Sequence, residues 1–109
     1  MDVHKTGGGI GFTVEHVRRA SNEELYTSLR ERLLRMLRSG TTLVEAKSGY
    51  GLDVDSEMKM LRVLEKAKKE LPIEISSTFC GAHSVPKWVK FIRKFTICKV
   101  EEYRISYCV

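Results

Sequence analysis

The chain has 109 residues, of which 42% are apolar and 30% charged, and its formal net charge is +5. This length allows one small domain. No apolar run is long enough to span a membrane, and the amino terminus lacks the core of a signal peptide. Three cysteines without CxxC spacing (Cys80, Cys98 and Cys108) indicate free thiols, so we expect a cytoplasmic protein.

The positive charge is concentrated near the carboxyl terminus. Residues 87–109 contain six Lys and Arg against two Glu, whereas residues 1–86 contain thirteen Lys and Arg against twelve Asp and Glu. The body of the chain therefore lacks the broad positive field that nucleic-acid binding usually needs. A small RNA-binding protein is a minor alternative that rests on the aromatic and basic tail alone.

Glycines dominate residues 7–12, which read GGGIGF. Val14 stands where a GxGxxG motif would place its third glycine, no GK[ST] ending follows, and no predicted strand precedes. We therefore expect a flexible connection or a substrate-side loop here rather than a phosphate-binding loop.

Residues 21–39 are predicted to form a helix. Ser21 and Glu24 have the spacing of a capping box, and Gly40 provides a stop. Apolar residues recur at helical spacing along one face: Leu25, Leu29, Leu33, Met36 and Leu37. We expect the arginines of this segment to form a solvated face.

A strand, a helix and a second strand are predicted to follow. The first strand spans residues 41–46 and the second spans residues 74–79. Asp53 and Asp55 offer N-caps for the helix between them, and Pro72 ends it. We expect its buried face to be traced by Val54, Met58, Leu61, Leu64 or Glu65, Lys68 and Leu71.

Both predicted strands end in turns that contain ring side chains. Tyr50 lies between two glycines after the first strand, and His83 follows the second. A strand–helix–strand order implies parallel strands, whose carboxyl ends share one sheet edge. We therefore expect Tyr50 and His83 to lie on one rim, where a hydroxyl and an imidazole can hold a polar planar ligand.

Other interpretations of these residues stay open. Tyr50 can instead pack sideways on the fold, His83 can be structural, and Cys80 can act as a nucleophile beside His83. The three histidines fall in no HxH or HExxH motif and in no Cys/His cluster, so the sequence predicts no metal ligands.

Several motifs together resemble the imidazolonepropionase family of the amidohydrolase superfamily. The segments that carry the resemblance are GGGIGFTVEHVRRAS, RSGTTLVEAKSGYGLD, EMKMLRVLEKAKKEL and FCGAHSVPK, and they extend to about Lys87. The resemblance implies an α/β fold, the βαβ portion of an incomplete metal-dependent (β/α)8 TIM barrel.

The resemblance also implies a reaction and a site. The family hydrolyses 4-imidazolone-5-propanoate to N-formimidoyl-L-glutamate in histidine degradation, with a zinc or iron ion activating the water. The tyrosine of its SGYG turn and the histidine of its GAH turn bind the substrate. By motif match these are Tyr50 and His83.

Other parts of the family pattern are missing from these 109 residues. The family's HxH metal motif, its substrate-carboxylate arginine, its later strand-end histidine and its metal-binding aspartate are absent. We therefore expect a truncated chain that is inactive alone. We divide the chain into a barrel segment, residues 1–87, and a divergent tail, residues 88–109. The tail could supply a third strand at residues 95–100 or 103–109. The alternative is a non-catalytic module that associates with a full-length partner.

Overall fold

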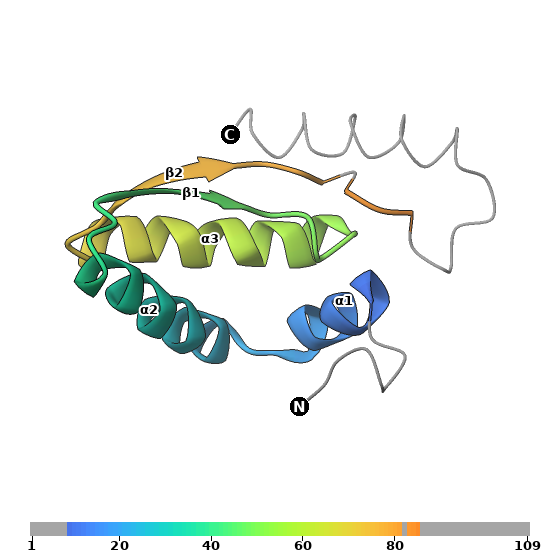
Figure 1. Cartoon of the computed structure of the whole chain (residues 1–109). Helices are drawn as coiled ribbons and strands as arrows, with labels where there is room; N and C mark the ends of the chain where they lie inside the picture. The colour runs from blue at the N-terminus through green and yellow to red at the C-terminus, as the bar shows by residue number, and fades with distance from the viewer. Residues whose placement is uncertain (1–8, 82, 86–109) are drawn as a thin grey trace.

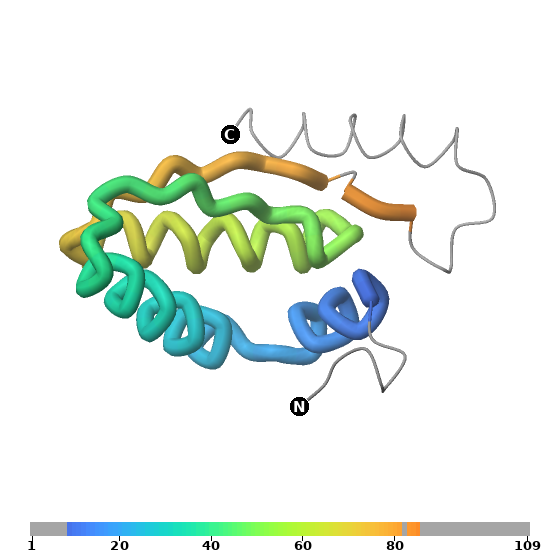
Figure 2. The backbone as a smooth tube through the Cα atoms, in the orientation of Figure 1, coloured from blue at the N-terminus to red at the C-terminus, as the bar shows by residue number. Residues whose placement is uncertain are grey.

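A computed structural model describes residues 9–81 and 83–85. The described part contains three helices and two strands (Figure 1). In chain order these are α1 Ile10–Arg19, α2 Asn22–Arg38, β1 Leu43–Lys47, α3 Val54–Glu70 and β2 Glu74–Thr78. The backbone trace shows all three helices on the same side of the two strands (Figure 2). No helix of this part is long and apolar enough to cross a membrane.

The two strands pair in parallel, as predicted from the strand–helix–strand order. The register runs from Leu43 opposite Glu74 to Lys47 opposite Thr78. The first strand begins two residues later than expected and includes Lys47, and the second ends one residue earlier, before Phe79. The observed architecture is thus a small α/β unit. The third strand considered at 95–100 or 103–109 falls outside the described residues.

Helix α2 confirms the predicted capping signals. The Ser21 hydroxyl accepts a hydrogen bond from the Glu24 amide at 3.2 Å, and the Glu24 carboxylate accepts one from the Ser21 amide at 2.8 Å. At the other end Gly40 has φ +94°, and the Gly40 and Thr41 amides donate to the carbonyls of Leu37 and Met36. This is a Schellman termination, which uses a residue of positive φ just after the helix.

Helix α1 corrects the expectation of a flexible connection for Ile10, Gly11 and Phe12. These residues form the first turn of a ten-residue helix, with Gly9 at the N-cap. Val14 of this helix is buried. The other end of α1 is held by Lys59 of α3, whose Nζ donates to the carbonyls of Val17, Arg18 and Ala20 at 2.8, 3.1 and 2.8 Å. A cation at the carboxyl end of a helix satisfies free carbonyls and complements the helix dipole.

The main core lies between α2, α3 and the sheet. Its buried members are Leu33, Ala67, Ile73 and Ile75. The predicted face of α3 is partly wrong: Leu64 is buried as expected, but Lys68 is exposed and Met58 and Leu61 are only half-buried. The side chains buried on α3 are Glu57, Val63, Leu64 and Ala67. The true inner face therefore carries a carboxylate near its amino end.

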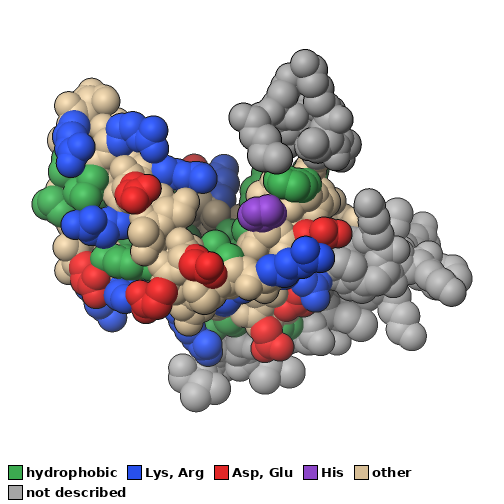
Figure 3. Space-filling model, turned by 90° about the horizontal axis from the view of Figure 1, so that it is seen from below, with side chains coloured by type: hydrophobic (Ala, Val, Ile, Leu, Met, Phe, Trp, Pro, Cys, Tyr) green, Lys and Arg blue, Asp and Glu red, His purple; other side chains and the backbone are tan. Residues whose placement is uncertain are grey.

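The surface seen from the helix side carries both charge signs. Lys and Arg side chains are interspersed with Asp and Glu across this face (Figure 3). The arginines of α2 at positions 30, 32, 35 and 38 are exposed, as predicted for a solvated face. Mixed charge on this face fits the near balance of acidic and basic residues in the body of the chain.

Candidate functional site

The first turn of the candidate site follows β1. Ser48 continues the strand pairing, because its amide donates to the Thr78 carbonyl at 3.0 Å. Gly49 then takes φ +123° and Leu52 takes φ +58°, so the chain reverses within five residues. Asp53 receives the Ser56 amide at 2.9 Å and starts α3, as predicted for an N-cap. Tyr50 is half-buried in the middle of this turn.

The second turn follows β2 and is tied to the first. The Cys80 amide donates to the hydroxyl of buried Ser48 at 3.1 Å, and the His83 amide donates to the Cys80 carbonyl at 3.1 Å. The exposed side chain of His83 thereby stands over the first turn. The Ser48 hydroxyl therefore links the end of β1 to the end of β2 and holds the two turns together.

Tyr50 and His83 lie together, as the parallel topology predicted. Their ring centroids are 5.1 Å apart and the ring planes are inclined by 52°. A tilted pair at this distance is a favourable aromatic arrangement. The substrate-binding role of the two residues, which the sequence motifs imply, stays a prediction.

Cys80 also comes close to His83. Its Sγ lies 3.9 Å from Nδ1 of the imidazole, and the thiol is half-buried and free. This contact occupies the Nδ1 side of the ring, so Nε2 is the nitrogen that can serve a ligand. The alternative of a thiol nucleophile beside the imidazole therefore has a geometric basis, although the contact is long for a proton transfer.

Glu57 is a residue of this site that sequence reasoning missed. It is fully buried, and its carboxylate accepts hydrogen bonds from the amides of Gly49, Gly51 and Leu52 at 2.8, 2.7 and 3.0 Å. A buried carboxylate is tolerated when backbone donors surround it. The available signal was its place seven residues before Leu64, on the inner face of the helix.

Both glycines around Tyr50 are required by close contacts. A Cβ on Gly49 would lie 2.9 Å from the Cys80 carbonyl oxygen and 2.9 Å from Cβ of His83. A Cβ on Gly51 would lie 2.7 Å from the backbone nitrogen of Glu57. The SGYG sequence therefore lets the first turn approach both α3 and the second turn.

On the outer face of the sheet, Glu45 of β1 bonds to Thr78 of β2. The Thr78 hydroxyl donates to the Glu45 carboxylate at 2.7 Å, and Lys47 lies 3.5 Å from the same carboxylate. The hydroxyl bond, with a smaller contribution from Lys47, lowers the pKa of Glu45. This bond joins the strands close to where the two turns begin.

A metal centre does not fit the described residues. Residues 9–81 and 83–85 contain no group of three His, Cys, Asp or Glu side chains that could hold a metal ion.

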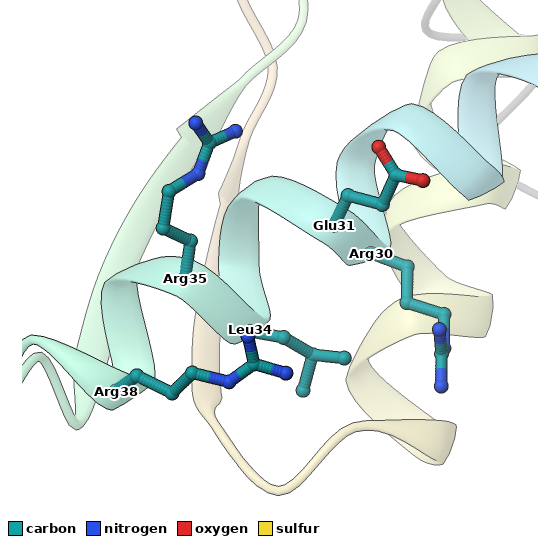
Figure 4. A pocket seen from close by; sticks show the side chains of 5 residues that line it. All are labelled: Arg30, Glu31, Leu34, Arg35 and Arg38. Atoms are coloured by element: carbon teal, nitrogen blue, oxygen red, sulfur yellow. The ribbon is translucent and has the colours of Figure 1, made fainter.

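A hollow elsewhere on the surface is no better candidate site. It has a volume of about 300 Å³ and is lined by Arg30, Glu31, Leu34, Arg35 and Arg38. All five side chains come from α2 and spread along it without converging on one point (Figure 4). The hollow therefore offers no second element that could fix a ligand.

Comparison with curated proteins identifies the relatives of this chain. It is 72% identical to the probable imidazolonepropionase of Nematostella vectensis, 67% to that of Xenopus tropicalis and 64% to that of Homo sapiens, each over 87 residues. The chain is a homologue of imidazolonepropionase over this region. The match covers 80% of the chain and 20% of each relative. No protein-family model matches the chain.

These relatives confirm the resemblance to imidazolonepropionase that the motifs indicated. The chain spans about a fifth of the length of the curated imidazolonepropionases it matches. The division at residue 87 and a cytoplasmic location stay predictions.

Proposed function

We propose that the two turns form a ring-binding site of the imidazolonepropionase type. The ligand is the planar ring of 4-imidazolone-5-propanoate, which such an enzyme hydrolyses to N-formimidoyl-L-glutamate in histidine degradation. The observation that carries the proposal is the 5.1 Å separation of the Tyr50 and His83 rings at the carboxyl edge of a parallel sheet. Similarity to proteins named imidazolonepropionase supports the choice of ligand.

The chemistry of the two side chains suits such a ring. The Tyr50 hydroxyl can donate to a ring carbonyl or accept from a ring N–H, and Nε2 of His83 offers a second polar contact. Because the two rings are inclined, the Tyr50 hydroxyl and His83 Nε2 would bind the ligand from different directions. Two such contacts would fix its orientation. Neighbouring polar groups on rigid strand ends are what orient a small ligand in α/β proteins.

We further propose that this βαβ unit is part of a (β/α)8 barrel and that a polypeptide of these 109 residues does not hydrolyse the ring alone. A barrel of this kind typically has about 250 residues. The absence of a metal-ligand group from the described residues supports the lack of turnover. The unit would then supply substrate contacts only.

Calorimetric titration of the purified chain with imidazole-4-propanoate tests the binding site. Tyr50→Phe and His83→Ala are each expected to weaken binding about tenfold, the loss of one hydrogen bond to a ligand. Tyr26→Phe removes a hydroxyl from α2, where it bonds to Glu70, and is expected to bind as the unchanged chain does. Equal affinity in all four proteins, or no binding by any, would contradict the proposal.

Turnover is tested separately. The chain is incubated with 4-imidazolone-5-propanoate and zinc or iron, and the absorbance of the ring is followed. We expect no loss of absorbance beyond the uncatalysed rate. Catalysed loss that a chelator abolishes would show that the chain is an enzyme by itself.

A second candidate function is association with a full-length imidazolonepropionase. Its support is apolar surface on and next to the strands, since Leu43 of β1 is 57% exposed and Phe79, directly after β2, is 40% exposed. Each strand also has only one pairing partner in the described part, and strands with a free edge tend to pair with other chains. Co-elution of the chain with the full-length human protein would support this candidate, and separate elution at micromolar concentration would exclude it.

A further inference from the structure

The turn that carries Tyr50 is held by a single buried carboxylate. Glu57 is 0% exposed, and its two oxygens together accept three backbone hydrogen bonds from the turn. Oε2 accepts from Gly49, and Oε1 accepts from Gly51 and Leu52. The bonded amides therefore lie on both sides of Tyr50.

This arrangement limits where the Tyr50 side chain can go. The three bonds measure 2.7–3.0 Å, which is normal for N–H···O bonds, and they hold the backbone on both sides of Tyr50. The turn also contains two residues of positive φ, Gly49 and Leu52, and both are among the bonded amides. A non-glycine residue held at positive φ needs surrounding structure to maintain it.

The opposite side of the turn is fixed by the second strand end. Gly49 approaches the Cys80 carbonyl and His83 so closely that no Cβ fits between them. A shift of the turn away from α3 would break the bonds to Glu57. A shift toward the second turn would drive Gly49 into the Cys80 carbonyl and His83. The first turn is therefore held by Glu57 and closely approached by the second turn.

We propose that Glu57 is the positioning residue of this site. It acts through the backbone of the turn and not by contact with the ligand. Its carboxylate holds the Gly49–Leu52 backbone so that Tyr50 stands beside His83 before any ligand arrives. The functional meaning of this inference rests on the proposed ring-binding role of Tyr50 and His83. Preorganisation of this kind raises affinity by removing the cost of ordering the site.

Glu57→Gln is the direct test, because it keeps the shape and replaces one acceptor oxygen with an NH2 group. That group cannot accept from an amide, so at least one of the three bonds is lost. Glu65→Gln is the matched control: it removes the same charge from the same helix at an exposed residue that pairs with Lys69. Far-UV circular dichroism checks that both variants keep their helices.

Two readouts separate positioning from a structural role. The first is the nuclear Overhauser effect between the ring protons of Tyr50 and His83, together with the amide shifts of Gly49 and Gly51. The second is affinity for imidazole-4-propanoate. With an unchanged dichroism spectrum, Glu57→Gln is expected to lose the ring–ring effect and to bind about tenfold more weakly. Glu65→Gln is expected to match the unchanged chain in both.

The outcomes distinguish this inference from the proposed function. If Glu57→Gln keeps the ring–ring effect and the affinity, Glu57 is not a positioning residue. If the ring–ring effect is lost but the unchanged chain never binds the probe, the positioning stands and the ring-binding function fails. If Glu57→Gln does not fold, the unchanged chain decides, since slow hydrogen exchange at the Gly49 and Gly51 amides is required and fast exchange at both overturns the inference.

Discussion

Gly49 lies so close to His83 that a Cβ on Gly49 would be 2.9 Å from Cβ of His83. The two residues are 34 positions apart and belong to different strand ends. Because of this close approach, the candidate site forms only when the ends of the two parallel strands lie side by side, and neither turn forms it alone.

Gly49→Ala is therefore expected to open the site. The new methyl group meets His83 and the Cys80 carbonyl, and alanine is strained at φ +123°. We expect a loss of about 3 kcal/mol in the free energy of unfolding. Gly40→Ala is the control, since Gly40 has φ +94° with open space around it and is expected to lose only about 1 kcal/mol. Equal losses in the two variants, measured by urea unfolding, would show that the contact with His83 is unimportant.

Lys59→Met is expected to release α1. The ammonium group of Lys59 bonds to three carbonyls at the end of that helix, and hydrogen bonds to charged groups contribute about 2 kcal/mol. Hydrogen exchange of the α1 amides should accelerate while that of α2 stays unchanged. Lys68→Met, at an exposed position of the same helix, is expected to leave both helices as they are. Unchanged exchange in α1 of Lys59→Met would mean that other contacts hold it.

Leu33→Ala is expected to cost about 3 kcal/mol in stability. Leu33 is 2% exposed and packs in the core cluster with Ala67, Ile73 and Ile75, so truncation removes buried contacts and leaves a cavity. Leu43→Ala deletes the same atoms at a residue that is 57% exposed, and it should change stability by less than about 0.5 kcal/mol. Thermal unfolding of both variants measures these two stability losses. Similar losses would show that Leu33 is not a core residue.

The pKa of Glu45 is expected to depend on the hydrogen bond that Thr78 of β2 donates to its carboxylate. The hydroxyl of Thr78 lowers the pKa of Glu45, and a lowered carboxylate pKa stabilises the folded chain above the unfolded value. That contribution disappears as the pH falls through the folded pKa. Thr78→Val should therefore raise the pKa of Glu45 in a carboxyl-carbon NMR titration. A titration midpoint that does not move would exclude this hydroxyl as the main cause.

Local signals made much of the fold predictable. The Ser21–Glu24 capping box and Gly40 define α2 because both act within one turn of the chain. The strands were placed within two residues of their observed ends, and their parallel pairing followed from the helix between them. The proximity of Tyr50 and His83 was predictable for the same reason, since topology alone brings parallel strand ends together.

Features that depend on contacts formed only in the folded chain were not predictable. Helix α1 starts in a glycine-rich segment, and its carboxyl end is held by Lys59, about 40 residues further along the chain. The amides that bond to Glu57 converge on its carboxylate only when the first turn has folded, with positive φ at Gly49 and Leu52. A carboxylate on the inner face of a helix gives no sign of such partners in the sequence.

The central claim is that Tyr50 and His83 form one site for an imidazolone-like ring. The most direct measurement is an NMR titration of the unchanged chain with imidazole-4-propanoate, followed at the ring protons of both residues. We predict that both sets of signals shift with one common midpoint. Shifts at only one of the two residues, or at neither, would contradict the claim.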